Sequence, residues 1–203
     1  TLSLEVEIMN KKTSFLFENH EEPAAGGYLL SDPFMGDPYF ERSVVYLCQH
    51  DSEGTFGMVL NNPLGLHLND VIDHPFTGDF PLFIGGPVSR NQLFFLHDQG
   101  DQIEGSLPVS DSLAFSGDFD ALVEYRTSKK NLKMKLKFFV GYSGWDEGQL
   151  EREIKEHSWI AVSNIPSTYS FSSNTHKLWT ACMELQGPKF KTISRFPKNP
   201  NEN

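Results

Sequence analysis

The sequence predicts a single α+β domain in which a mostly antiparallel β-sheet is flanked by a few helices. Runs of β-forming residues follow one another closely and are joined by short turns, as residues 43–49 and 56–60 are. Helical patterns are scattered irregularly among these runs, so a doubly wound parallel sheet is not expected. The 203 residues contain no clear internal linker, which favours one large domain over the two small ones that the length also allows.

The predicted centre of the sheet is a hairpin. Apolar side chains occupy both alternating sets of positions in residues 43–49, which predicts a strand covered on both faces. Residues 50–54 supply short polar side chains and a glycine, as a turn requires. The second strand, 56–60, contains Gly57, which indicates a bulge or a close backbone approach. Pro63 ends it, because proline cannot donate to the ladder.

The remaining elements are predicted from local patterns in chain order. A polar, loosely ordered arm is expected over residues 1–25, a single domain over 26–186, and a frayed tail over 187–203. β-forming runs predict further strands at 27–31, 82–84, 93–97, 107–115, 132–142 and 159–162. Helical spacing or helix-start residues predict helices at 66–72, 119–126, 147–157 and 174–185.

The charge balance opposes direct binding to nucleic acid. The formal net charge is −10, whereas a duplex-binding protein needs Lys and Arg to displace counterions from phosphates. The exception is a basic run at 129–137, which could form a local patch. We interpret it as a loop followed by a half-buried strand, with Lys133, Lys135 and Lys137 on the solvent face.

Composition predicts a soluble cytoplasmic protein. No apolar run approaches the length of a membrane span, and no signal-peptide pattern is present. Cys48 and Cys182 lie in apolar surroundings without a Cys-x-x-Cys spacing, so we expect reduced packing residues. No motif calls for a cofactor or a metal ion, and either a monomer or a dimer is expected.

Several motifs together resemble the signature of the YqgE/AlgH family of uncharacterised proteins, also grouped as UPF0301. In chain order they are Asp37-Pro38-x-Phe40-x-Arg42-Ser43-Val44-Val45, His50, Gly54-x-x-Gly57, Asn61-x-Pro63-Leu64, Gly85-Gly86-Pro87-Val88, Leu96-His97, Gly141-Tyr142-Ser143-Gly144-Trp145 and Gly148-Gln149-Leu150-Glu151. The resemblance covers residues 26–186. The chain departs from the family at Asn62, where lysine is usual, and at Ser143, where alanine is usual.

The resemblance implies a compact domain of coiled, branching β-sheets flanked by helices. Some members of that family are described as transcriptional regulators. Because this chain is acidic and shows no helix-turn-helix, such a role would be indirect, through a protein partner. The first hypothesis is therefore a non-enzymatic binding or regulatory module whose partner is an unknown protein or small molecule.

The alternative hypothesis is a small-molecule-binding protein or enzyme. Its pocket would be built around Asp37, Arg42, His50, Asn61 and His97, which are polar residues near predicted strand ends. The same side chains could instead have structural roles, such as tying the 37–42 loop to its strand or capping turns. Neither His-x-x-x-His nor His-Glu-x-x-His spacing occurs, so no metal site is predicted.

Three further residues complete the candidate ligand or partner site. Gly85 and Gly86 could expose backbone N–H groups to an anion, or could simply form a tight turn. Trp145 follows a glycine-rich segment that invites comparison with a nucleophile elbow. That motif needs glycine at position 145, so a nucleophilic Ser143 is not expected. The candidate site thus comprises Asp37, Arg42, His50, Asn61, Gly85, Gly86, His97 and Trp145.

Overall fold

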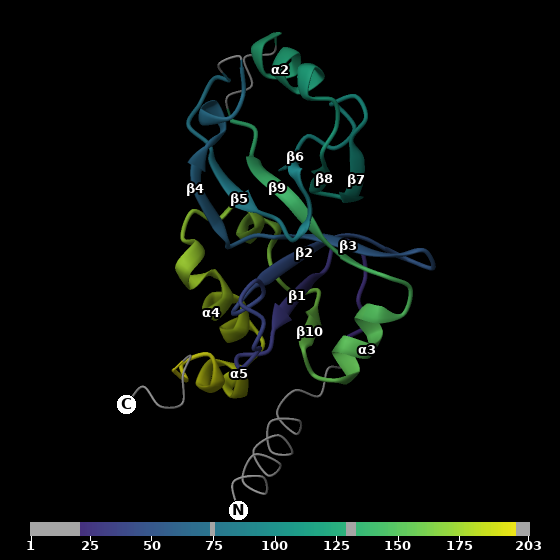
Figure 1. Ribbon diagram of the computed structural model, residues 1–203, viewed down its shortest axis with the longest axis vertical. Coiled ribbons are helices and arrows are strands. Elements are labelled where there is room, and N and C mark those ends of the chain that lie inside the picture. The colour runs from purple at the N-terminus through teal and green to yellow at the C-terminus, as the bar shows by residue number, and fades with distance from the viewer. Residues whose placement is uncertain (1–20, 74–75, 129–132, 198–203) are drawn as a thin grey trace, which may run out of the picture.

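The structure, a computed structural model, describes residues 21–73, 76–128 and 133–197 (Figure 1). Its strands are β1 (Tyr28–Ser31), β2 (Val44–Asp51), β3 (Gly54–Val59), β4 (Pro63–His67), β5 (Pro81–Ile84), β6 (Val88–His97), β7 (Leu107–Ser110), β8 (Leu113–Phe115), β9 (Leu136–Trp145) and β10 (Trp159–Val162). Its α-helices are α2 (Phe119–Ser128), α3 (Gln149–Lys155), α4 (Thr175–Leu185) and α5 (Pro188–Ile193), and its 3-10 helices are η1 (Leu68–Asp70) and η2 (Ser167–Phe171).

The strands of the described residues form one sheet of ten. Eight of them follow the order β10-β1-β2-β3-β9-β6-β8-β7, and β4 and β5 lie off this path. Most neighbours are antiparallel, and the sheet does not close into a barrel. The prediction of a single α+β domain with a mostly antiparallel, branching sheet is confirmed. No helix within the described ranges is long and apolar enough to cross a membrane.

The sheet branches at β9. Along one edge, β9 first pairs in parallel with β5, at Phe138 to Val140, and then antiparallel with β3, at Ser143 to Trp145. Along its other edge it pairs with β6. β4 joins only through β5, which gives the side branch visible beside β9 (Figure 1). One long strand therefore connects the two halves of the molecule.

Alternating side chains of the β2 strand enter two different cores, as the sequence pattern predicts. Val44 and Tyr46 pack in a core with α4, whereas Val45 and Leu47 pack in a core with Leu150 of α3. A third core lies beneath α2 and contains many of the phenylalanine rings. Both faces of the central strand are thus covered by helices.

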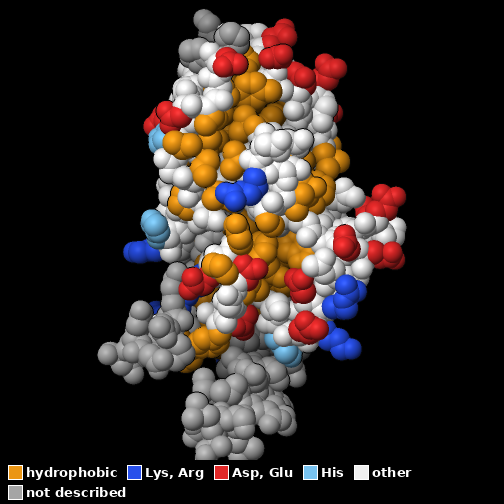
Figure 2. Space-filling model, in the orientation of Figure 1, with side chains coloured by type: hydrophobic (Ala, Val, Ile, Leu, Met, Phe, Trp, Pro, Cys, Tyr) orange, Lys and Arg blue, Asp and Glu red, His pale blue; other side chains and the backbone are white. Residues whose placement is uncertain are grey.

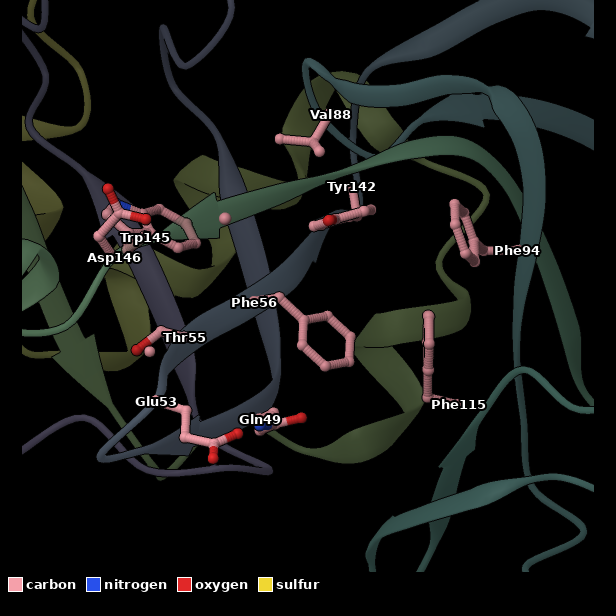
Figure 3. A pocket seen from close by; sticks show the side chains of 12 residues that line it. Gln49, Glu53, Thr55, Phe56, Val88, Phe94, Phe115, Tyr142, Trp145 and Asp146 are labelled. Carbon is pink, nitrogen blue, oxygen red and sulfur yellow. The ribbon is translucent and has the colours of Figure 1, made fainter.

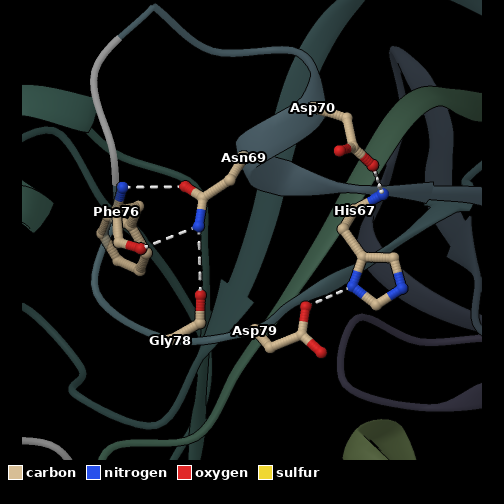
Figure 4. Close-up of polar contacts among 6 residues, drawn as sticks. All are labelled: His67, Asn69, Asp70, Phe76, Gly78 and Asp79. Carbon is tan, nitrogen blue, oxygen red and sulfur yellow. Dashed lines mark hydrogen bonds and ion pairs between the residues drawn. The ribbon is translucent and has the colours of Figure 1, made fainter.

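The predicted helix at 66–72 is wrong for most of its length. The chain continues as strand β4 beyond Pro63, and only the single turn η1 follows. The loop after η1 is held by Asn69, which accepts a hydrogen bond from the Phe76 N–H at 2.8 Å and donates to two carbonyl oxygens of the same loop (Figure 4). At its base, the His67 ring contacts the Asp79 carboxylate. Asparagine side chains that bond loop backbone favour such turns over helix.

Helix structure extends into the expected C-terminal tail. α5 packs against α4, and Ile193 is buried in the core beside it. Phe196, beyond α5, contacts the ring of Phe34 and accepts a hydrogen bond from Arg42. The expected arm falls mostly on residues 1–20, which lie outside the described residues.

Lys137 corrects the interpretation of the basic run. Lys133 and Lys135 are exposed as expected, but Lys137 is only 5% exposed. Its Nζ lies 4.2 Å from the centre of the Phe83 ring and 3.4 Å from the Ser172 carbonyl oxygen. At residue 137, β9 already lies between β6 and β5, and both of its faces are covered at this point.

Candidate functional site

A groove of about 560 Å³ lies where β3, β6, β8 and β9 meet (Figure 3). Its lining comes from the β2–β3 hairpin, both ends of β6, β8 and the end of β9. The lining residues are Gln49, Glu53, Gly54, Thr55, Phe56, Val88, Phe94, Phe115, Tyr142, Gly144, Trp145 and Asp146. Its volume falls in the range of roughly 300–1,000 Å³ that is common for ligand pockets.

Four aromatic side chains form a closed cycle of ring contacts at one end of the groove. The ring centres lie 5.1 Å apart for Phe56 and Phe115, and 5.7 Å apart for Phe115 and Phe94. They lie 5.8 Å apart for Phe94 and Tyr142, and 5.9 Å apart for Tyr142 and Phe56. All four side chains are only partly buried. We call these four residues the aromatic cluster.

Sheet irregularities open the space above the cluster. β6 and β9 pair at Val88 with Tyr142, and then not again until Leu93 with Val140. On the other edge of β9, Gly144 lies opposite Phe56. A Cβ atom on Gly144 would lie 3.4 Å from the Tyr142 ring and 3.9 Å from a methyl carbon of Val88. A larger side chain at this glycine would therefore occupy the groove without a backbone clash.

The opposite end of the groove is acidic. Glu53, beside Gln49, and Asp146, beside Trp145, lie apart from each other on the side of the groove opposite Phe94 and Phe115 (Figure 3). Both residues are exposed, and neither forms an ion pair within the described ranges. The lining contains no lysine, arginine or histidine. One face of the molecule carries a band of hydrophobic side chains down its middle, with Lys or Arg side chains within the band and carboxylates beside it (Figure 2).

Three of the candidate residues predicted from sequence hold the loop before β2. Asp37 is exposed and accepts a hydrogen bond from the Tyr39 N–H at 2.8 Å. Asn61 accepts from the Val44 N–H and donates to the Arg42 carbonyl oxygen, both at 2.9 Å. The Arg42 guanidinium stacks on the Trp179 ring, 5.1 Å from its centre. These contacts tie the loop to β3 and α4.

The two candidate histidines have separate surroundings. His50 Nδ1 lies 2.7 Å from the Thr55 hydroxyl, and its Nε2 lies 3.6 Å from the Glu151 carboxylate. His97 is fully buried; its Nε2 lies 3.0 Å from both the Ser106 hydroxyl and the Ser116 carbonyl oxygen. Burial lowers the pKa of His97.

The five polar residues of the alternative hypothesis fall into three settings: the loop before β2 with Asp37, Arg42 and Asn61, the pair of His50 with Thr55, and the buried His97. None of Asp37, Arg42, His50, Asn61 and His97 lines the groove. Among all eight candidate residues, only Trp145 does. No group of three His, Cys, Asp or Glu side chains that could hold a metal ion occurs in the part of the chain that the structure describes.

Gly85 and Gly86 lie where backbones approach closely. A Cβ on Gly85 would lie 2.3 Å from the Gly141 carbonyl oxygen, and one on Gly86 would lie 2.3 Å from the Tyr142 carbonyl group. Ser143 is buried, and its hydroxyl donates to the Gly85 carbonyl oxygen at 3.0 Å. These residues join β5 to β9.

Sequence reasoning missed the aromatic cluster. Phenylalanine is among the residue types most often buried, so the sequence favours the core for both Phe94 and Phe95. Phe95 does belong to the core, but Phe94 points to the other face and into the groove. Strand alternation separates the two side chains. It does not reveal that the second face is left partly open, because that depends on which strands lie beside it.

Comparison with known proteins decides the family. A family model described as AlgH-like matches residues 28–191. The chain belongs to the AlgH-like family. A UPF0301 protein of Bacteroides fragilis is 41% identical over 186 residues, covering 91% of this chain and 94% of the relative. A UPF0301 protein of Parabacteroides distasonis is 43% identical over 180 residues, covering 88% and 90% of the two chains.

Two solved structures share the fold of this chain. The solution structure of AlgH from Pseudomonas aeruginosa has a TM-score of 0.69 at 26% identity, covering 88% of this chain and 97% of that one. A crystal structure of a Corynebacterium diphtheriae protein has a TM-score of 0.71 at 23% identity, covering 87% and 94%. The Corynebacterium diphtheriae structure therefore shows that the two proteins share a fold.

Proposed function

We propose that this AlgH-like chain is a non-enzymatic binding module that holds a protein partner in the groove between β3, β6, β8 and β9. One observation carries the proposal: the aromatic cluster is left partly exposed in a groove instead of being sealed in the core. Aromatic side chains supply much of the binding energy in protein interfaces. A cytoplasmic regulatory role would then be indirect, through that partner.

The lining supports binding over chemistry. Its titratable side chains are the carboxylates of Glu53 and Asp146 and the phenol of Tyr142. The hydroxyl of Thr55 lies beside the His50 ring, so it already has a partner. The lining contains no histidine, cysteine or lysine that could act as a base or nucleophile. The net charge of −10 further favours a protein over a nucleic acid.

Site-specific photo-cross-linking in a bacterium that carries this gene tests the proposal. A benzoylphenylalanine at Val88, whose side chain is exposed at the groove, should give a discrete protein adduct. The same group at Lys177, exposed on α4, is the matched control and should not give it. Adding Gly144→Val, which fills the groove, should remove the Val88 adduct.

Two results would overturn the proposal. One is the same adducts from Val88 and Lys177; the other is an adduct that persists after Gly144→Val in a variant with unchanged unfolding. Native mass spectrometry tests the alternative that the groove holds a small molecule. A small molecule retained by the wild type and lost on Gly144→Val would replace the protein partner with a small ligand.

A further inference from the structure

Building on the binding role proposed above, we infer that the groove recognises a partner segment that presents an arginine beside a large apolar side chain. The apolar side chain packs on the aromatic cluster. The guanidinium lies on the acidic side of the groove, which carries Glu53 and Asp146. This assignment names the chemistry of the partner, which the proposed function leaves open.

The shape of the groove separates two kinds of contact. At one end the rings of Phe56, Phe94, Phe115 and Tyr142 form a continuous apolar surface, with Val88 at its edge. At the other end Glu53 and Asp146 project from the β2–β3 turn and from the end of β9 (Figure 3). A purely apolar segment would leave both carboxylates unpaired, and a purely basic one would leave the rings exposed.

Charge complementarity selects a cation for the acidic end. Glu53 and Asp146 are both free of ion pairs within the described residues, and no lysine or arginine of the lining neutralises them. The planar guanidinium fork matches carboxylate geometry and stacks on aromatic faces, whereas the lysine ammonium is a more strongly hydrated point charge. Arginine therefore suits an acidic site beside aromatic rings better than lysine does.

An extended segment with a Phe-x-Arg spacing is a simple probe of this inference. In an extended chain, residues i and i+2 project from the same face, roughly 7 Å apart. A Phe-x-Arg sequence places both side chains on the groove side, with the middle residue turned away. This spacing allows a short peptide to serve as a defined probe.

The test is an NMR titration of the full chain with three peptides. They are acetyl-Phe-Ala-Arg-amide, its citrulline counterpart, in which the guanidinium becomes a neutral urea of the same shape, and acetyl-Ala-Ala-Arg-amide. We expect the first to shift backbone amide signals around the groove and to bind roughly ten times more tightly than either other peptide. The difference in affinity between the arginine and citrulline peptides should become smaller as the salt concentration is raised.

Matched variants assign the effect to the named residues. The double variant Glu53→Gln and Asp146→Asn should bring the arginine peptide down to the affinity of the citrulline peptide. Asp120→Asn with Glu156→Gln, which removes two exposed carboxylates elsewhere, should leave the tenfold difference intact. Gly144→Val should weaken both Phe-containing peptides.

The outcomes separate this inference from the proposed function. Equal affinity for the arginine and citrulline peptides would overturn arginine recognition and leave the groove as a binding site. Failure of all three peptides, together with a protein adduct from Val88, would also overturn it while the proposed function stands. Failure of the peptides and of the cross-link would overturn both.

Discussion

The indole N–H of Trp145 donates a 2.8 Å hydrogen bond to the Glu153 carboxylate, which ties the end of β9 to α3. The same carboxylate oxygen accepts from the indole of Trp159 at 2.8 Å. The other oxygen accepts from the Gln149 side chain, also at 2.8 Å. One partly buried carboxylate thus holds two tryptophans that pack edge to face, and Trp145 forms part of the groove wall.

Replacing Glu153 with glutamine should destabilise the fold. The amide keeps one acceptor oxygen and turns a donor toward an indole or amide N–H, so at least one buried donor loses its partner. We expect the free energy of unfolding to fall by roughly 1–3 kcal/mol, measured by urea denaturation with tryptophan fluorescence. Glu156→Gln, at an exposed position after α3, should change it by less than about 0.5 kcal/mol. Equal effects of the two substitutions would contradict this role for Glu153.

Gly57 should tolerate no side chain. A Cβ there would lie 2.5 Å from the Tyr46 carbonyl oxygen and 2.9 Å from a methyl carbon of Val45, so Gly57→Ala must push β2 and β3 apart. We expect a loss of roughly 1–3 kcal/mol in chemical denaturation. The control is Gly36→Ala, where the added Cβ meets nothing within 4 Å. A Gly57→Ala variant as stable as the control would show that the two strands can separate without cost.

Lys137 should make the stability of the protein depend on pH in the alkaline range. Burial lowers the pKa of its amine to about 7, whereas the unfolded chain keeps the proton up to roughly pH 10.4. Between these values the unfolded state binds more protons, so stability rises with pH. Relative to Lys137→Met, the wild type should gain up to roughly 1.4 kcal/mol per pH unit from pH 7.5 to 9.5.

Urea denaturation at several pH values measures this slope. Lys135→Met is the control, because Lys135 is an exposed residue on the same segment. Its curve should run parallel to that of the wild type. A Lys137→Met curve that also runs parallel would mean that the amine stays protonated in the folded state.

His97 should make the protein sensitive to mild acid. Burial lowers its pKa below the value of 6.5 expected in an unfolded chain. Its contribution is therefore present above pH 6.5 and is lost as the pH falls toward its folded pKa. Between pH 7.5 and 5.5, the wild type should lose stability more steeply than His97→Gln. His176→Gln, at an exposed position on α4, should keep the wild-type slope, and a matching slope for His97→Gln would rule out this effect.

Local patterns predicted elements whose signal lies within a few residues. The alternation in β2 predicted a strand covered on both faces, and Gly57 indicated the close approach that the β2–β3 pairing shows. The helix at 66–72 failed, because its short apolar pattern also suits a strand, and pairing with β5 decided between them. The prediction that Lys137 lies on the solvent face failed for a similar reason. Alternation separates the two faces of a strand but does not show what covers each face.

Turn residues, strand periodicity and motif order predict the α+β class, the central hairpin and the family, because these signals lie within neighbouring positions of the chain. The site follows only from how strands distant in the sequence pair in the fold. Phe56, Phe94, Phe115 and Tyr142 come from four strands, and they meet because β9 pairs with β3 on one edge and β6 on the other, with β8 beyond β6. Exposure of the aromatic cluster depends on that long-range pairing, which no local pattern contains.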